Sequence, residues 1–146
     1  MPKAKKHITV TAETGQQFYQ EFQGKGKVVM LNLLNFKAKA DYTDNENMKP
    51  ENNITGAEAY KLYMKHTQPC IRKAGSKLLF SGTSNSFLIG PKSEKWDMML
   101  LVEHASVEKF MEFAMDKEYL KTAGHRTAAL EDSRLLPIAE LKQSGS

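Results

Sequence analysis

Two strand-like segments of the chain are apolar on both of their faces, and this feature restricts the fold more than any other. The segments are residues 28–36 (VVMLNLLNF) and 96–102 (WDMMLLV). Successive side chains of a strand point to opposite faces. Both faces of the first segment carry Val, Leu, Met or Phe, with Asn32 on one face and Asn35 on the other. Such a strand needs cover on both sides, because exposing each large apolar side chain costs roughly 1.5–3 kcal/mol.

Capping motifs locate the helices around these strands. The runs Thr14–Gln17 and Thr55–Glu58 both fit the capping box that begins a helix. Phe18 and Phe22 then lie one turn apart on one face of the first helix. Gly75 is the natural end of the second and longest helix.

The full set of elements has the order of a split βαβ unit. The expected order is a flexible lead-in (1–13), a helix (14–23), a strand (28–36), a long loop (37–54), the main helix (55–75), two strand pieces (78–80 and 87–89), a strand (96–102), two helices capped by Ser106 and Asp116, of which the second continues to Leu130, a last strand (134–141) and a polar tail (142–146). We predict one ferredoxin-like α+β domain over residues 14–141 with an extra N-terminal helix. Pro137 indicates that the last strand lies at an edge or a bulge.

The apolar second face of the sheet predicts a homodimer. Helices of a split βαβ unit normally pack on one face of its sheet, which leaves the other face open. The simplest cover for that face is the sheet of a second copy. We therefore expect the sheet to pair with that of a partner, as in a dimeric α/β barrel.

Composition and charge exclude several function classes. The chain has 146 residues, one cysteine (Cys70) and a net charge of +4. It has no apolar run long enough to span a membrane and no secretory signal, and an unpaired cysteine fits a reducing compartment. We expect a cytoplasmic protein. The charges alternate in sign and form no basic stripe, so neither nucleic acid nor membrane is an expected partner.

Three segments of the chain are similar to a known protein family. They are Val28–Phe36, Trp96-Asp97 at the start of a strand, and His125–Leu135, with Glu118-Tyr119 shortly before the last of them. Together they resemble a bacterial family of unknown function in the dimeric α/β-barrel superfamily. The resemblance covers about residues 14–138. It implies a dimer and a pocket between the sheet and the helices, but it assigns no catalytic residue.

The resemblance leaves several functions open, because relatives in that superfamily perform different reactions. They include antibiotic-biosynthesis monooxygenases, haem-degrading monooxygenases, muconolactone isomerases and chlorite dismutases. The first hypothesis is a dimer that binds a small apolar or mildly anionic molecule, with cofactor-free oxygenase or isomerase activity as one option. The second is a non-catalytic binding or stress-related dimer. The third and weakest is a haem-binding or haem-degrading protein. No cofactor and no metal are otherwise expected.

The candidate ligand-binding residues are polar or aromatic side chains at positions that the fold turns inward: Asn32, Tyr63, His66, Trp96, His125 and Arg126. Asn32 interrupts an apolar strand face, and a buried amide needs hydrogen-bond partners. Its partner is either a ligand in the pocket or a neighbouring loop or helix end. His66 and Tyr63 line a pocket under the main helix, or they pack between helix and sheet with their polar tips at the rim.

His125 and Arg126 form a second candidate pair, on the late helix or at its Gly124 break. A histidine can transfer protons near neutral pH, and an arginine can hold a carboxylate. The structural alternative is that Arg126 pairs with an acidic neighbour or a backbone carbonyl and fixes the last strand.

Trp96 and His104 share a strand face if the strand extends that far. With Asn32 they would then be similar to the residues that haem-degrading relatives use. The alternative is a packed Trp96 and an exposed loop histidine at position 104. We expect Cys70 to be an inert buried thiol. The loop 37–54 is either a functional lid or disordered.

Overall fold

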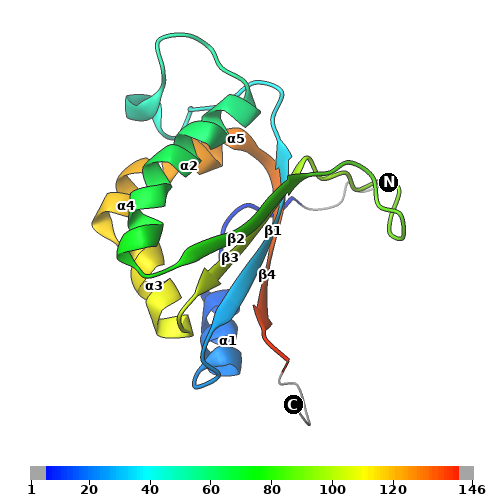
Figure 1. Cartoon of the computed structure of the whole chain (residues 1–146). Coiled ribbons are helices and arrows are strands. Elements are labelled where there is room, and N and C mark those ends of the chain that lie inside the picture. Colours follow the sequence, from blue (N-terminus) through cyan, green and yellow to red (C-terminus); the bar gives the residue numbers. More distant parts are fainter. Residues whose placement is uncertain (1–5, 142–146) are drawn as a thin grey trace.

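The computed structural model describes residues 6–141, which form a four-stranded antiparallel sheet with helices on one face (Figure 1). The elements in chain order are α1 (Ala12–Phe22), β1 (Val28–Phe36), η1 (Glu46–Met48), α2 (Gly56–Lys73), β2 (Lys77–Thr83), β3 (Met98–His104), α3 (Val107–Met115), α4 (Lys117–Thr122), α5 (Gly124–Ala129) and β4 (Leu130–Ala139). The strand order is β2-β3-β1-β4. The predicted ferredoxin-like α+β fold with an extra N-terminal helix is confirmed.

Strand β1 is central, because both β3 and β4 pair with it. Leu31 lies opposite Leu101 of β3 on one side and Leu136 of β4 on the other. Strands β2 and β4 form the two edges of the sheet. Pro137 therefore lies on an edge strand, where a residue without an N–H group is tolerated, as the sequence predicted.

The covered face of the sheet holds the hydrophobic core. Leu34, Leu100 and Leu130 of the sheet are buried and belong to one cluster with α2 residues such as Ala59 and Tyr60. Full burial of each leucine contributes roughly 1.5–3 kcal/mol. None of the helices formed by residues 6–141 is both long and apolar enough to span a lipid bilayer.

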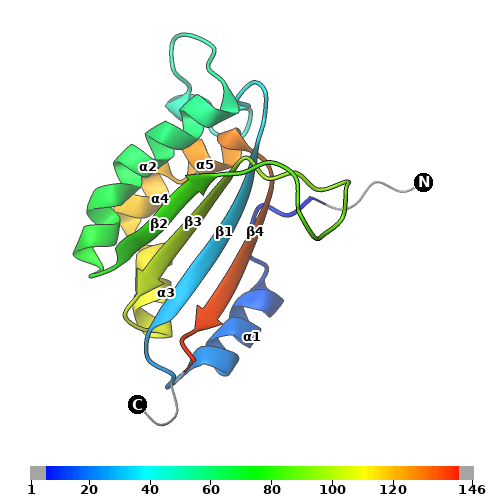
Figure 2. The ribbon, with the colours of Figure 1, turned by 45° about the vertical axis from the view of Figure 1, so that its right-hand side comes forward.

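The opposite face of the sheet is also apolar, but no helix formed by residues 6–141 covers it (Figure 2). Cross-strand register places Leu31, Leu101, Leu136 and Phe80 on this uncovered face. Leu136 and Phe80 are each 56% exposed. The prediction that the central strand is apolar on both faces is thus confirmed, and one of those faces lies open in the protomer.

Several predicted element boundaries are wrong. Helix α1 begins at Ala12 rather than at residue 14, because Thr11 is its N-cap and Thr14 closes the capping box as the third helical residue. The expected flexible lead-in includes Lys6, His7 and Ile8, which instead contact the start of β4 and the end of α5. Residues 1–5 of that lead-in, and the predicted tail 142–146, lie outside the described residues.

The predicted strand piece 87–89 does not form. Leu88 is fully exposed. The two arms of the β2–β3 connection are linked by an isolated bridge between Ser86 and Lys95, and by the backbone N–H groups of Ser84 and Trp96, which donate to the carbonyls of Asp97 and Asn85. Strand β3 begins at Met98, two residues after the predicted start.

The late helical region also departs from the prediction. One helix was expected from its Asp116 cap to Leu130, but the chain forms α4, turns at Ala123 and forms the short α5. Asp116 does cap α4, as predicted. Strand β4 starts at Leu130, four residues before the predicted start at residue 134, because α5 ends at Ala129.

Helix α2 begins and ends as its sequence predicts. Thr55 and Glu58 form the reciprocal capping box, and Gly75 adopts φ 74° just beyond the C-cap. At its other end Gly56 packs directly on backbone: a Cβ there would overlap the carbonyl of Lys37 and lie 2.6 Å from the carbonyl oxygen of Ala129. Glycine at this position lets α2, the loop 37–54 and α5 meet.

We expect Gly56→Ala to lower the free energy of unfolding by about 1–3 kcal/mol, because the new methyl group meets rigid backbone. The control is Gly15→Ala in α1, where the added Cβ meets only a Val10 methyl group at 3.4 Å. Better helix propensity should leave that variant unchanged or stabilise it by up to about 1 kcal/mol. Urea denaturation measures both. Equal effects of the two substitutions would contradict the close packing described for Gly56.

Candidate functional site

A group of tyrosines lies on the covered side of the sheet, next to Arg126. Tyr60 and Tyr63 lie on α2 with ring centroids 5.1 Å apart. The hydroxyl of Tyr63 is 2.9 Å from that of Tyr119 on α4. Arg126 of α5 is close enough to Tyr60 and Tyr63 for its charge to act on both phenols. We call these four residues the tyrosine–arginine cluster.

Tyr60 and Tyr63 keep their phenolic protons at neutral pH. Burial raises the pKa of Tyr60 above its ordinary value, and the charge of Arg126 offsets this only in part. Burial also raises the pKa of Tyr63 well above its ordinary value, and the neighbouring phenols of Tyr119 and Tyr60 add to the effect. A neutral phenol is a hydrogen-bond donor. The cluster therefore offers donors and one positive charge.

Arg126 is half-buried and has no carboxylate partner among residues 6–141. Its Nη1 donates to the backbone carbonyl of Ile8, at 2.6 Å. A bond to a backbone carbonyl was one of the structural alternatives that the sequence left open for Arg126. Arg134 differs, since its Nη1 lies 2.7 Å from Asp132. A partly buried guanidinium without an anion is an unusual arrangement, because buried charges are normally paired.

Asn32 lies on the same face of the sheet as the core residue Leu34. It is paired with Leu100 of β3 and Leu135 of β4. Its side-chain amide donates to the carbonyl of Met30 at 3.3 Å, within its own strand, rather than to a loop or a helix end. The covered face is not fully closed at this point, since Leu135 is 37% exposed. The amide of Asn32 therefore lies at a part of the sheet that solvent reaches.

His66 and His125 lie together in a second group. Their rings stack with centroids 5.5 Å apart, and Nδ1 of His125 is 2.8 Å from the hydroxyl of Tyr42. His125 and Tyr42 are buried, whereas His66 is exposed. Burial lowers the pKa of His125, and His66 adds to that effect. His125 is thus neutral at neutral pH, and its bond to Tyr42 ties the loop 37–54 to α5.

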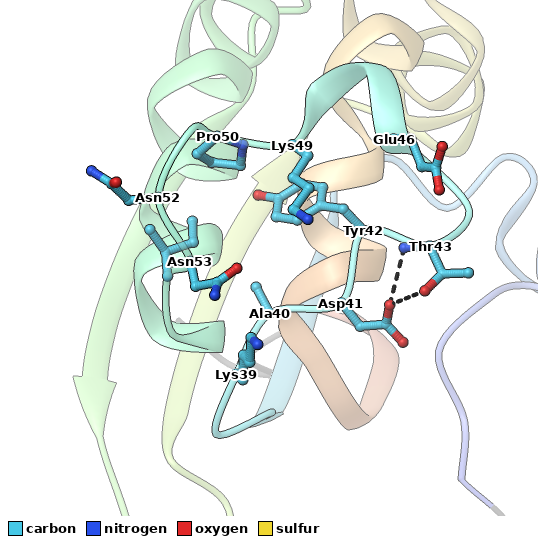
Figure 3. A pocket seen from close by; sticks show the side chains of 11 residues that line it. Lys39, Ala40, Asp41, Tyr42, Thr43, Glu46, Lys49, Pro50, Asn52 and Asn53 are labelled. Carbon is cyan, nitrogen blue, oxygen red and sulfur yellow. Dashed lines mark hydrogen bonds between the residues drawn. The ribbon is translucent and has the colours of Figure 1, made fainter.

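The loop 37–54 has a defined path in the structure, whereas a disordered loop was one of the two alternatives that the sequence left open. Its backbone is bonded to α5 residues Ala128 and Ala129. It surrounds an open concavity of about 670 Å³ (Figure 3), whose charged lining residues are Lys39, Asp41, Glu46 and Lys49. These charges are mixed in sign, so the concavity shows no preference for an anion or a cation.

Trp96 lies away from the other candidates, on the uncovered face of the sheet. The guanidinium of Arg134 lies 5.0 Å from the centroid of its ring. With Leu33 and Met99, Trp96 lines a cavity of about 260 Å³. The prediction that Trp96 and His104 share a strand face is wrong, because Trp96 precedes β3 and does not follow the alternation of its side chains.

The expectation of an exposed loop histidine at position 104 is wrong. His104 is the last residue of β3 and its side chain turns into the protein, where it is only 2% exposed. Its Nδ1 is 2.7 Å from the Ser76 hydroxyl, and the rings of Phe110 and Phe113 pack on it. Burial lowers the pKa of His104 to about 4. This is a structural histidine held in its neutral form.

Two further features concern metal binding and the single cysteine. Within residues 6–141 there is no group of three or more His, Cys, Asp or Glu placed to hold a metal ion. Cys70 is buried, and burial raises the pKa of its thiol, with Asp116 and Glu118 adding to the effect. The sequence prediction of an inert buried thiol agrees with this environment.

Sequence reasoning missed two residues that complete these groups, Ile8 and Tyr42. Neither stands in a motif, and each comes from a segment that had been expected to be irregular. Their roles depend on how distant parts of the chain meet, which no local pattern records.

A family model matches residues 50–138, which include α2 and the whole tyrosine–arginine cluster. The chain belongs to the family described as a domain of unknown function, DUF1330. A comparison with curated proteins gave no match. The resemblance seen in the sequence is thereby confirmed as to family.

Solved structures agree with this assignment. A protein of unknown function from Rhodopseudomonas palustris is 36% identical, with a TM-score of 0.83 over 95% of this DUF1330 chain and 100% of its own. A dabb-family protein with a ferredoxin-like fold from Mesorhizobium loti is 12% identical, with a TM-score of 0.50 over 80% and 99%. A Caulobacter crescentus protein proposed to be an antibiotic biosynthesis monooxygenase is 7% identical, with a TM-score of 0.50 over 86% and 99%. The last two likenesses show the fold alone.

We expect the neutral state of His104 to make stability depend on pH. Its pKa is about 4 in the folded protein and near 6.5 otherwise, so the unfolded chain takes up a proton first as the pH falls. Stability is therefore complete above about pH 6.5 and declines toward pH 4, by up to about 3 kcal/mol.

Urea denaturation between pH 7.5 and 4 tests this expectation. His104→Gln should flatten the decline, whereas the exposed His7→Gln should not. If wild type and His104→Gln lost stability with the same slope, burial of the neutral imidazole would not be its source.

Proposed function

We propose that this DUF1330 protein is a homodimeric binding protein for a small, mostly apolar molecule that carries an anionic group. The observation that carries this proposal is Arg126, a half-buried guanidinium with no carboxylate partner among the described residues. We place the site at Arg126, where α5 meets α2 and α4 beside the tyrosine–arginine cluster.

The composition of the tyrosine–arginine cluster supports this class of ligand. A guanidinium binds a carboxylate through charge-assisted hydrogen bonds, often two at once. The neutral phenols can donate further bonds to the same anion, and their rings provide an apolar wall. Asn32, on the open part of the same sheet face, could add a polar contact to the ligand.

Catalysis is not part of this proposal. The cofactor-free oxygenase or isomerase option needs a group that removes a proton from the ligand, and the phenols of Tyr60 and Tyr63 hold their own protons tightly. The buried imidazole of His125 is engaged by Tyr42. The haem alternative assumed that Asn32, Trp96 and His104 lie on one face of the sheet. Trp96 lies on the opposite face from Asn32 and His104, so nothing in these residues favours haem.

We expect Arg126→Gln to weaken binding of the probe 1-naphthoate by roughly tenfold to hundredfold, the effect of losing a charge-assisted hydrogen bond. Isothermal titration measures the affinity, and native mass spectrometry of the purified protein shows whether a ligand is retained. Arg72→Gln, an exposed arginine of the same fold region, is the control. Unchanged affinity in Arg126→Gln, with binding to wild type intact, would remove Arg126 from the site.

The homodimer part of the proposal is supported by the uncovered face of the sheet. Leu31, Leu101 and Leu136 are neighbours across three strands, and the outer strands leave Leu136 and Phe80 widely exposed. Contiguous apolar patches of this kind are typical of interaction surfaces. A two-fold axis would bring the same patch of a second copy onto the first, so that each hides the other from water.

We expect Leu136→Lys to convert the dimer to a monomer, because it places a charge in the centre of an apolar interface. Leu120→Lys is a matched control: Leu120 on α4 is also 56% exposed but lies away from the sheet. Sedimentation velocity at micromolar concentration should show wild type and Leu120→Lys as dimers. A wild-type protein that sediments as a folded monomer would contradict the proposal.

A further inference from the structure

We propose that residues 6–8 occupy the ligand's place at Arg126, and that their chemistry identifies the ligand as a small monocarboxylate with a branched or aromatic apolar body. This inference rests on the function proposed above. We call residues 6–8 the strap. In the described protein the strap closes the site, and the ligand displaces it.

The strap is held against β4 by a few specific contacts. The His7 amide donates to Asp132 at 2.8 Å, and the hydroxyl of Ser133 donates to the His7 carbonyl at 2.6 Å. The ammonium of Lys6 lies 2.5 Å from Glu131 at the surface. Residues far apart in sequence thus place the strap beside the end of α5, where Arg126 lies.

Ile8 presents to the protein the two features that a ligand would need. Its carbonyl oxygen accepts the hydrogen bond from Arg126 at 2.6 Å. Its side chain packs against the hydrophobic core. An oxygen acceptor next to a short branched hydrocarbon is also the outline of a small branched carboxylic acid.

A carboxylate is the better partner for Arg126. The Ile8 carbonyl is neutral, whereas a carboxylate adds its charge and can bind a guanidinium through two parallel bonds. Most of the strap's other polar contacts are exposed, and exposed contacts stabilise little because water competes for the same groups. The exchange of Ile8 for a carboxylate is therefore favourable.

The surrounding charges favour a ligand with one negative charge. Glu131 and Asp132 lie at the start of β4, just after α5, which carries Arg126. They bind Lys6 and the amide of His7 in the strap. Asp132 is paired with Arg134, whereas Glu131 loses its Lys6 partner when the strap leaves, so Glu131 repels a second carboxylate on the ligand. A dicarboxylate should bind more weakly than a monocarboxylate of the same size.

Loosening the strap tests the competition without altering Arg126. Ser133→Ala removes the bond to the His7 carbonyl, and Ser81→Ala on strand β2 is the control. Isothermal titration with 1-naphthoate, neutral 1-naphthol and naphthalene-1,4-dicarboxylate measures affinity in each variant. Amide hydrogen exchange at His7, whose N–H donates to Asp132, reports on the strap itself in the wild-type protein.

We expect 1-naphthoate to bind Ser133→Ala roughly threefold to tenfold more tightly than wild type or Ser81→Ala, and to speed exchange of the His7 amide. Equal affinities with unchanged exchange would show that the ligand binds without displacing the strap, which overturns this inference and leaves the proposed function standing. Binding of 1-naphthol or of the dicarboxylate as tight as that of 1-naphthoate would overturn the ligand class. No binding of any probe to any variant would overturn both the inference and the proposed anion site.

Discussion

Strand β1 carries apolar side chains on both faces, and the rest of the molecule is arranged around that constraint. On one face Leu34 and Met30 are buried beneath the helices. On the other, Leu31 lies between Leu101 of β3 and Leu136 of β4, and no helix formed by residues 6–141 lies above them. A sheet with two apolar faces and one helical layer needs a second covering layer, and in the proposal made above a second copy of the chain supplies it.

The same arrangement positions the candidate site. Helices α4 and α5 are short and replace one continuous helix, so Tyr119 and Arg126 approach α2 from two directions. The loop 37–54 is fastened to α5 by the hydrogen bond between Tyr42 and His125, the residue before Arg126. The strap then joins the first described residues to β4 and reaches Arg126. Groups from both ends of the chain therefore meet at one arginine.

Much of the fold could be predicted from local chemistry. The capping box at Thr55 and the stop at Gly75 fix α2, and Ser106 and Asp116 start the helices expected of them. The start of α1 was misplaced because Thr11 and Thr14 are equally good caps by type, and only the structure shows which hydroxyl accepts the bond. The late helix is not continuous, because the chain turns at Ala123 and begins α5 at Gly124, the position where the sequence left a break as an alternative.

The candidate site was less accessible to sequence reasoning. Trp96 lies before β3, which begins at Met98, so it does not follow the alternation of that strand and lies on the opposite face of the sheet from His104. The partner of Arg126 could not be foreseen, because Ile8 lies 118 positions away in the chain. Residue types thus indicated candidate groups, whereas only the tertiary structure shows which of them meet.

The central claim is that a second copy covers the uncovered sheet face, and oxidative footprinting of two methionines tests it most directly. Met99 lies on that face, paired with Leu33, whereas Met115 at the end of α3 is 70% exposed. Peroxide converts accessible methionines to the sulfoxide. The account predicts that dilution speeds oxidation of Met99 and leaves that of Met115 unchanged. Oxidation of Met99 at one rate across all concentrations, in a folded protein, would contradict it.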